Sequence, residues 1–118
     1  MAHDHDRRRA PRLAAGWQAR YAVDARPDDG WYGCRVLDIS LGGVALELFG
    51  PAPLQDAGIQ VEVRVPERPL ALHLRARARY VGPSTNTGIR VGVEWHDVTP
   101  IQSQILNSLL ARIYARAS

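Results

Sequence analysis

Two short segments of the chain carry side chains suited to holding an anion that bears a purine base. Arg8 and Arg12 stand four residues apart, and Asp38-x-Ser40-x-x-Gly43 follows about a strand and a half later. An arginine donates two parallel hydrogen bonds, which suits the O6 and N7 acceptors of guanine, and it stacks on aromatic rings. A fixed carboxylate accepts from the N–H edge of the same base. Together, the segments indicate an anionic guanine nucleotide as the ligand.

The second segment has the composition of a turn, because short polar side chains bond their own backbone and glycines tolerate positive φ. Asp38 and Ser40 are expected on one side of an extended stretch, and Gly43 is expected to let a ligand approach the backbone. Such a turn is by itself more often structural than ligand-binding, and an arginine cluster is often only solubilising charge. The prediction therefore depends on both segments occurring together.

The remainder of the chain predicts the scaffold that positions these segments. Residues 1–12 contain four arginines and little apolar surface, which predicts a flexible arm. Six segments then alternate apolar and polar residues or are rich in β-branched and aromatic ones, which predicts a mainly β fold, a small six-stranded antiparallel barrel. The expected strands cover residues 17–23, 31–39, 44–49, 59–65, 70–81 and 89–95.

The last part of the chain changes its period. Apolar residues recur at spacings of three and four from residue 101 to 113, which predicts an amphipathic helix over about 99–116. Thr99 is the expected N-cap and Pro100 opens the first turn. We expect this helix to lie across or beside the barrel, so that residues 13–118 form one domain.

Composition excludes several classes of function. The 118 residues include 15 basic ones, all arginine, against 12 acidic ones, for a net charge of +3. The length is too short for a multidomain enzyme, and the lack of lysine excludes Schiff-base and P-loop chemistry. His73 and His96 are isolated in the sequence, and His3 and His5 form no closed metal site. We therefore expect no enzymatic activity, no metal and no cofactor.

The cellular setting is predicted from two further features. Cys34 is the only cysteine, and no secretory signal is recognisable, which favours the cytoplasm. No apolar run approaches the roughly 18 residues of a spanning helix, so no membrane insertion is expected.

The two motifs resemble those of the PilZ domain, the bacterial receptor family for cyclic di-GMP. Arg8-Arg9-Ala10-Pro11-Arg12 matches the family's RxxxR, and Asp38-Ile39-Ser40-Leu41-Gly42-Gly43 matches its [D/N]xSxxG. The resemblance extends over the arginine arm, the barrel, the run Val91-Gly92-Val93-Glu94-Trp95 and the trailing helix. It implies a PilZ-type β-barrel with a C-terminal helix.

The resemblance also implies a role for each motif residue. Arg8 and Arg12 would grip the guanines and phosphates of cyclic di-GMP, Asp38 and Ser40 would bond a guanine edge, and Gly43 would keep the turn open. Arg7 occupies the position before the motif that bears on stoichiometry in the family. An arginine there favours an intercalated pair of ligands over a single one.

Function is then expected to be that of a non-enzymatic receptor that changes its protein contacts when cyclic di-GMP binds, in motility, biofilm or related signalling. One alternative is a ligand-independent adaptor of the same fold in pilus or motility machinery. Another is a nucleic-acid-binding barrel that uses the arm and the row Arg75, Arg77 and Arg79, which otherwise reads as a solvated strand face. That alternative lacks exposed aromatics between the basic residues. The downstream partner is open, and the helix leaves a homodimer possible.

Overall fold

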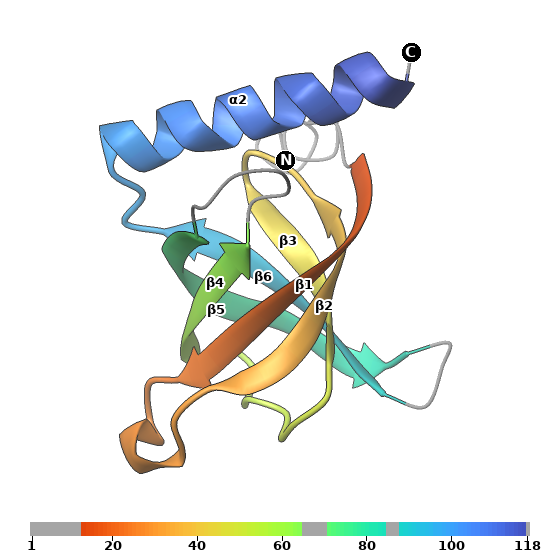
Figure 1. The fold of residues 1–118 in the computed structure, drawn as a ribbon. Helices are drawn as coiled ribbons and strands as arrows, with labels where there is room; N and C mark the ends of the chain where they lie inside the picture. Colours follow the sequence, from red (N-terminus) through yellow and green to blue (C-terminus); the bar gives the residue numbers. More distant parts are fainter. Residues whose placement is uncertain (1–12, 65–70, 85–87, 118) are drawn as a thin grey trace, which may run out of the picture.

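Six antiparallel strands close into a barrel in the order β1-β2-β3-β6-β5-β4 (Figure 1). This computed structural model describes residues 13–64, 71–84 and 88–117. A short 3-10 helix, Pro27–Asp29, joins the first two strands. The strands are β1 Leu13–Val23, β2 Tyr32–Ile39, β3 Gly43–Leu48, β4 Gly58–Arg64, β5 Ala71–Pro83 and β6 Ile89–His96.

Alternation along the strands fills the barrel interior. In β4, Ile59, Val61 and Val63 are fully buried while the polar residues between them face outward. The same pattern in the other strands supplies one continuous core. Cys34 belongs to this core, and its burial raises the pKa of the thiol from 9.0 to about 12. The cysteine is therefore a packing residue rather than a reactive thiolate.

Helix α2, Pro100–Ala117, lies across one end of the barrel (Figure 1). Its apolar side reaches the core through Leu106 and Leu109, which are 1% and 5% exposed. Thr99 caps the helix as expected. Its hydroxyl accepts from the Gln102 N–H at 3.2 Å, and the Gln102 side chain accepts from the Thr99 N–H at 3.0 Å. The helix thus closes an end of the barrel that would otherwise expose its interior.

The predicted fold class is confirmed, with six antiparallel strands and a C-terminal helix. Strand β1 begins at Leu13, earlier than the predicted Trp17, because its first residues pair with the end of β2. The predicted arm, residues 1–12, lies outside the described residues.

The alternation of apolar and basic residues in β5 predicts that Tyr80 faces the core together with Leu72, Leu74, Ala76 and Ala78, and this prediction is wrong for Tyr80. Strict alternation from Leu72 to Ala78 places Tyr80 in the core, yet Tyr80 is 54% exposed. The register with β6 shifts between Ala78 and Tyr80, so that Arg79 is an extra residue in the ladder. This β-bulge reverses the faces of the residues that follow it.

Candidate ligand-binding site

The turn between β2 and β3 is organised by the side chain of Ser40. Its Oγ accepts from the N–H groups of Gly42 and Gly43 at 3.2 and 3.3 Å, and its hydroxyl lies 3.3 Å from the Gly43 carbonyl. The Ser40 N–H also donates to the Gly43 carbonyl at 2.9 Å. Ser40 is only 5% exposed. The hydroxyl therefore fixes the shape of the turn, so the serine of the DxSxxG pattern has a structural role.

Trp95 anchors this turn to β6. Its backbone N–H donates to the Gly42 carbonyl at 2.9 Å, and its indole Nε1 donates to the Ser40 carbonyl at 3.1 Å. The ring is 8% exposed and belongs to the core. Because a buried indole N–H needs an acceptor, core packing and turn position are coupled in one residue.

Gly43 is required by the approach of β3 to β6. A Cβ at this position would lie 2.0 Å from the Val93 carbonyl oxygen. The absence of a side chain here thus serves the strand pairing between Gly43 and Glu94. Room for a ligand beside Gly43, which the sequence suggested, stays a prediction.

Asp38 faces outward because of a bulge at Leu37. Cys34 and Val36 point into the core, and simple alternation would send Asp38 there as well. The register with β3 shifts between Val36 and Asp38, so that Ile39 fills the core instead. The Asp38 side chain is 21% exposed, in contrast to the buried Ser40. Two residues expected to share one side thus have different surroundings.

Arg90 on β6 forms an ion pair with this carboxylate. Its Nη2 lies 3.7 Å from the Asp38 Oδ2, and its own side chain is 46% exposed. The arginine and the carboxylate together form a polar edge on the outer face of β2, β3 and β6. Asp38 is therefore held partly exposed beside a positive charge.

Strand β1, which follows the arm in the sequence, begins next to this carboxylate. Leu13 pairs with Ile39 and Ala14 pairs with Asp38 in the β1–β2 ladder. Arg12 is bonded directly to Leu13 in the chain, although Arg7, Arg8 and Arg12 themselves lie outside the described residues. The structure thus brings the strand that follows the RxxxR segment to the strand that carries Asp38.

A second polar group lies along the same outer face. Glu47 on β3 is 5% exposed, and it accepts from the Arg35 guanidinium at 2.9 Å and from the Ser84 hydroxyl at 2.6 Å. These contacts satisfy a buried carboxylate, which would otherwise be costly. The group fixes the ends of β3 and β5 rather than offering an open acceptor.

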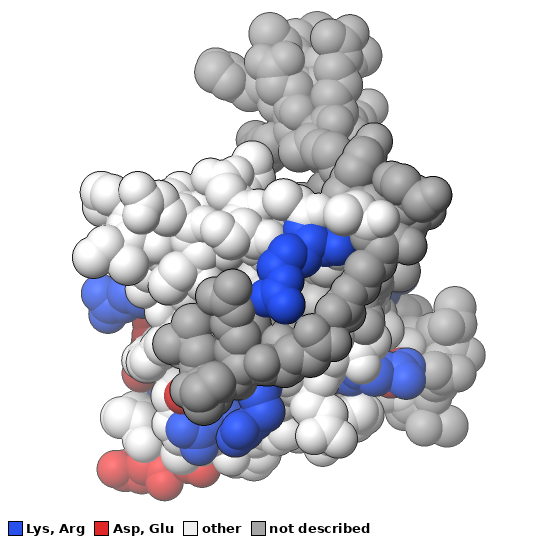
Figure 2. All heavy atoms as spheres, turned by 45° about the horizontal axis from the view of Figure 1, so that its top comes forward, with Lys and Arg blue, Asp and Glu red and all other residues white. Residues whose placement is uncertain are grey.

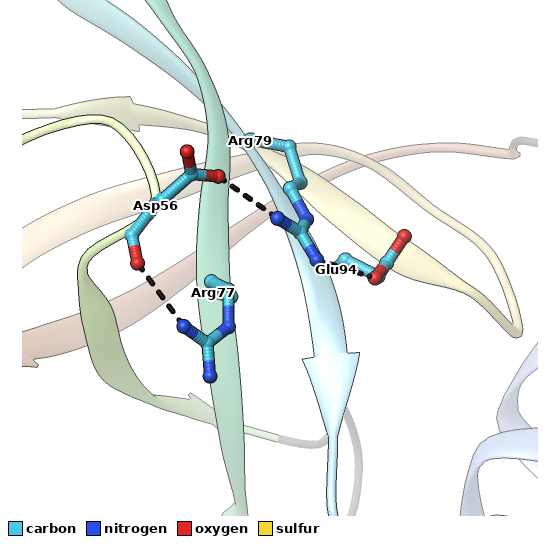
Figure 3. A network of polar contacts seen from close by, with 4 residues as sticks. All are labelled: Asp56, Arg77, Arg79 and Glu94. Atoms are coloured by element: carbon cyan, nitrogen blue, oxygen red, sulfur yellow. Dashed lines mark hydrogen bonds and ion pairs between the residues drawn. The ribbon is translucent and has the colours of Figure 1, made fainter.

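The arginine row of β5 is engaged with a loop, as Figure 3 shows. Arg79 Nη1 lies 2.8 Å from the Asp56 Oδ1, and Arg79 Nη2 lies 3.3 Å from the Glu94 Oε1. These two carboxylates raise the pKa of Arg79 above its ordinary value. Arg77 Nη1 donates to the Asp56 carbonyl at 3.4 Å. Part of the expected solvated face therefore holds the connection between β3 and β4.

Charge on the surface is divided rather than continuous. Viewed toward the helix-covered end, the arginine side chains of the described residues appear as separate patches (Figure 2). Several arginines outside this motif region face carboxylates on neighbouring strands, such as Arg20 with Glu62 at 2.9 Å. The hydrogen bond with Arg20 is the main cause that lowers the pKa of Glu62. Such pairing reduces the net positive charge that the barrel wall presents.

Two residues of this region were missed as site residues by the sequence analysis. Trp95 was named only as part of the last strand, and Arg90 was not singled out. The signal for Trp95 was available, because a Trp at a core position must find an acceptor for its indole. Arg90 gave no such signal, since its partner depends on the register of three strands.

Within the described parts of the chain, no three His, Cys, Asp or Glu side chains gather at a potential metal site. A search over those same residues finds no helix with the length and apolarity needed to cross a bilayer.

Comparison with family models gives a match to the PilZ domain over residues 6–112. The chain belongs to the PilZ domain family. The match includes both motifs, six strands and most of α2. No match was found among curated proteins.

Solved PilZ structures share the fold. The PilZ domain of YcgR from Escherichia coli, solved with c-di-GMP, superposes with a TM-score of 0.74 at 20% identity and covers 94% of both chains. K. pneumonia MrkH in complex with c-di-GMP gives 0.77 at 17% identity, with 92% of this chain and 53% of that one covered. The Bacillus subtilis inhibitor of motility MotI gives 0.73 at 16%, covering 93% and 53%. This chain thus spans about half the length of MrkH and MotI.

Proposed function

We propose that this PilZ domain is a receptor for cyclic di-GMP. The observation that carries the proposal is the pairing of Leu13 with Ile39, beside Asp38. Consecutive Cα atoms are about 3.8 Å apart, so the arginine that ends the RxxxR segment starts its side chain near the DxSxxG turn. The two motifs can then act on one ligand. Solved relatives of the same fold, the YcgR PilZ domain and MrkH, hold c-di-GMP in their structures.

In this proposal, each motif residue has a separate task. Arg8 and Arg12 donate to the guanines and phosphates, and Asp38 accepts from a guanine N–H edge. Ser40 also lies beside that edge, while its bonds to Gly42 and Gly43 hold the turn in shape. Arg7 adds charge that favours an intercalated pair of ligands. No step of this scheme breaks or forms a covalent bond, so the proposed role is that of a receptor rather than an enzyme.

Binding would be read out through a changed surface. A ligand that bridges residues 1–12 to the β2–β3 turn holds the arm against the domain formed by residues 13–118, and a partner protein senses the new surface. We place this readout in the cytoplasm and in motility or biofilm signalling. The partner is expected to bind the ligand-bound surface more tightly than the ligand-free one.

Calorimetric titration with cyclic di-GMP tests the proposal. Wild type is expected to bind, and Arg12→Ala and Asp38→Ala are each expected to weaken binding by at least about tenfold, because a charge-assisted hydrogen bond contributes about 1.5–3 kcal/mol. Arg8→Ala is expected to behave like Arg12→Ala.

Arg26→Ala is the matched control. This exposed arginine lies in the β1–β2 connection, at the far end of the β1–β2 ladder from Asp38, so its loss removes one charge without touching the site. No heat with wild type would refute the proposal. Equal weakening by Arg26→Ala would show that only net charge matters.

A further inference from the structure

Strands β1 and β4 separate toward one end of the barrel, and a polar cavity lies where they part. β1 begins at Leu13 but pairs with β4 only from Ala19 onward, opposite Val63. Before that pair, β1 is irregular around Gly16, whose φ is 67°. The cavity has a volume of about 310 Å³. It is lined by Gln18, Ala19, Arg20, Glu62 and Arg64.

This cavity lies on a different side of the barrel from the proposed ligand site. The strand order β1-β2-β3-β6-β5-β4 places the junction of β1 with β4 two strands away from the junction of β3 with β6 in either direction. The polar edge formed by Asp38 and Arg90 belongs to the outer face of β2, β3 and β6. A group bound in the cavity therefore makes contacts separate from those proposed for cyclic di-GMP.

The guanidinium of Arg20 is held in a fixed position at the cavity. Its Nε and Nη2 donate to the two carboxylate oxygens of Glu62 at 2.9 and 3.1 Å. Its Cζ lies 4.7 Å from the centroid of the Trp31 ring, in a cation–π contact. Because Nε and Nη2 serve Glu62, the N–H groups of Nη1 are left as donors. A side chain that is already ordered loses little conformational entropy when it binds another group.

Arg64 supplies positive charge that the cavity does not balance. Its side chain is exposed, and it forms no ion pair within the part of the chain that the structure describes. Arg64 does act on Glu62, since it is one of the charges that, after the hydrogen bond from Arg20, lower the pKa of that carboxyl. Two arginines and one carboxylate line the cavity, which leaves one positive charge in surplus.

The lining indicates the kind of group that fits. Pockets for small organic molecules are lined mainly by apolar and aromatic side chains, whereas Ala19 is the one apolar residue among those that line this cavity. A single surplus positive charge beside Glu62 matches a singly charged carboxylate better than a phosphate dianion, which Glu62 would repel more strongly. The planar guanidinium of Arg64 suits a carboxylate, to which it can donate two parallel hydrogen bonds.

We propose that this cavity receives the carboxylate of an Asp or Glu side chain of a partner protein. Arg64 and the Gln18 amide donate to this carboxylate, and Nη1 of Arg20 adds a further contact. Arginine and tryptophan are enriched among the residues that dominate binding energy at protein interfaces, and here Trp31 supports Arg20. The proposal goes beyond the receptor function, because it assigns a protein contact to a wall of the barrel that the cyclic di-GMP site does not use.

Two peptides that differ in one side chain test the proposal. N-acetyl-glycyl-glutamyl-glycinamide carries the carboxylate, and N-acetyl-glycyl-glutaminyl-glycinamide carries a neutral amide of the same shape. In 0.15 M salt, where charges more than about 8 Å apart are largely screened, the glutamate peptide is expected to give saturable amide shifts at Gln18, Ala19 and Arg20 of the wild-type protein. The glutamine peptide is expected to bind at least about tenfold more weakly, because it lacks the charge-assisted hydrogen bonds.

Arg64→Ala is expected to weaken binding of the glutamate peptide by at least about tenfold, because it removes the surplus charge and its donors. Arg75→Ala is the matched control. Arg75 is also an exposed arginine without an ion pair among the described residues, and it does not line the cavity. This control variant is expected to bind the peptide like wild type.

Three results would overturn the proposal. They are equal affinity for the two peptides, shifts confined to residues outside the cavity, and unchanged affinity in Arg64→Ala. Equal weakening by Arg75→Ala would also overturn it, because net charge alone would then explain binding. None of these results bears on the titration with cyclic di-GMP, so the receptor function and the partner site stand or fall separately.

Discussion

The two connections that flank β3 are held in different ways. The β2–β3 turn is fixed from within by the Ser40 hydroxyl and the Trp95 indole, both buried. The β3–β4 connection is fixed from outside, by Arg79 and Asp56, whose side chains are 49% and 61% exposed. Buried hydrogen bonds are costly to lose, whereas exposed ion pairs contribute little. The difference indicates that the turn beside Asp38 is built to keep one shape.

Among the substitutions that test this comparison, substitution of Trp95 is expected to have the largest effect on the free energy of unfolding. Trp95→Ala removes a core ring and the donor to the Ser40 carbonyl, so the free energy of unfolding should fall by about 3–5 kcal/mol. Trp95→Phe keeps most of the ring and should lose less. Chemical denaturation measures both. Equal stability of the Phe variant and wild type would mean that the indole bond does not secure the turn.

Substitution of Gly43 tests how much the close approach of β3 to β6 contributes to stability, apart from the flexibility of the turn. Gly43→Ala should destabilise the protein by about 2–4 kcal/mol, because its Cβ would meet the Val93 carbonyl oxygen. Gly42→Ala is the matched control, since a Cβ there lies 4.0 Å from the Ser40 Oγ and meets no other atom as close. Thermal unfolding of both variants tests this. A larger effect at position 42 would contradict the account.

Substitution of Ser40 tests the contribution of the side-chain hydrogen bonds in the turn alone. Ser40→Ala leaves the N–H groups of Gly42 and Gly43 without their side-chain acceptor, which should cost about 1–3 kcal/mol. Ser108→Ala, on the exposed side of α2, should change stability by less than about 0.5 kcal/mol. Denaturant titration compares the two. Similar small losses would show that the hydroxyl is dispensable to the fold.

Arg79 should give the smallest change in stability. Arg79→Ala removes exposed ion pairs with Asp56 and Glu94, for which we expect a smaller loss of stability than for any substitution above, and one that shrinks further at high salt. Arg75→Ala, one further arginine of the row, is the control. A loss as large as that of Ser40→Ala would remove the contrast between the two connections.

The sequence predicted most of the scaffold because alternation and helix periodicity were strong. Strand β4 was placed to within one residue at its start, and the Thr99 cap was placed correctly. The motif pattern also located the β2–β3 turn. What alternation could not supply was the facing of Asp38 and Tyr80, because a bulge depends on register with a neighbouring strand rather than on local residue types.

At the site, Ser40 and Arg90 show the same limit of prediction from the sequence. The serine was assigned to a ligand, yet its hydroxyl is bonded within the turn, a role that the spacing of Ser40 and Gly43 also permits. Arg90 was not singled out, because its proximity to Asp38 arises across three strands. Local motifs therefore located the region, and strand register determined which side chains share its surface.

Amide chemical shifts recorded while cyclic di-GMP is added to the wild-type protein test the central claim most directly. We expect saturable shifts at Asp38–Gly43 and at Ala45 and Gly92, with the β3–β4 connection around Asp56 much less affected. Absence of shifts at saturating ligand, or shifts confined to the β3–β4 connection, would contradict the assignment of the ligand to the DxSxxG turn.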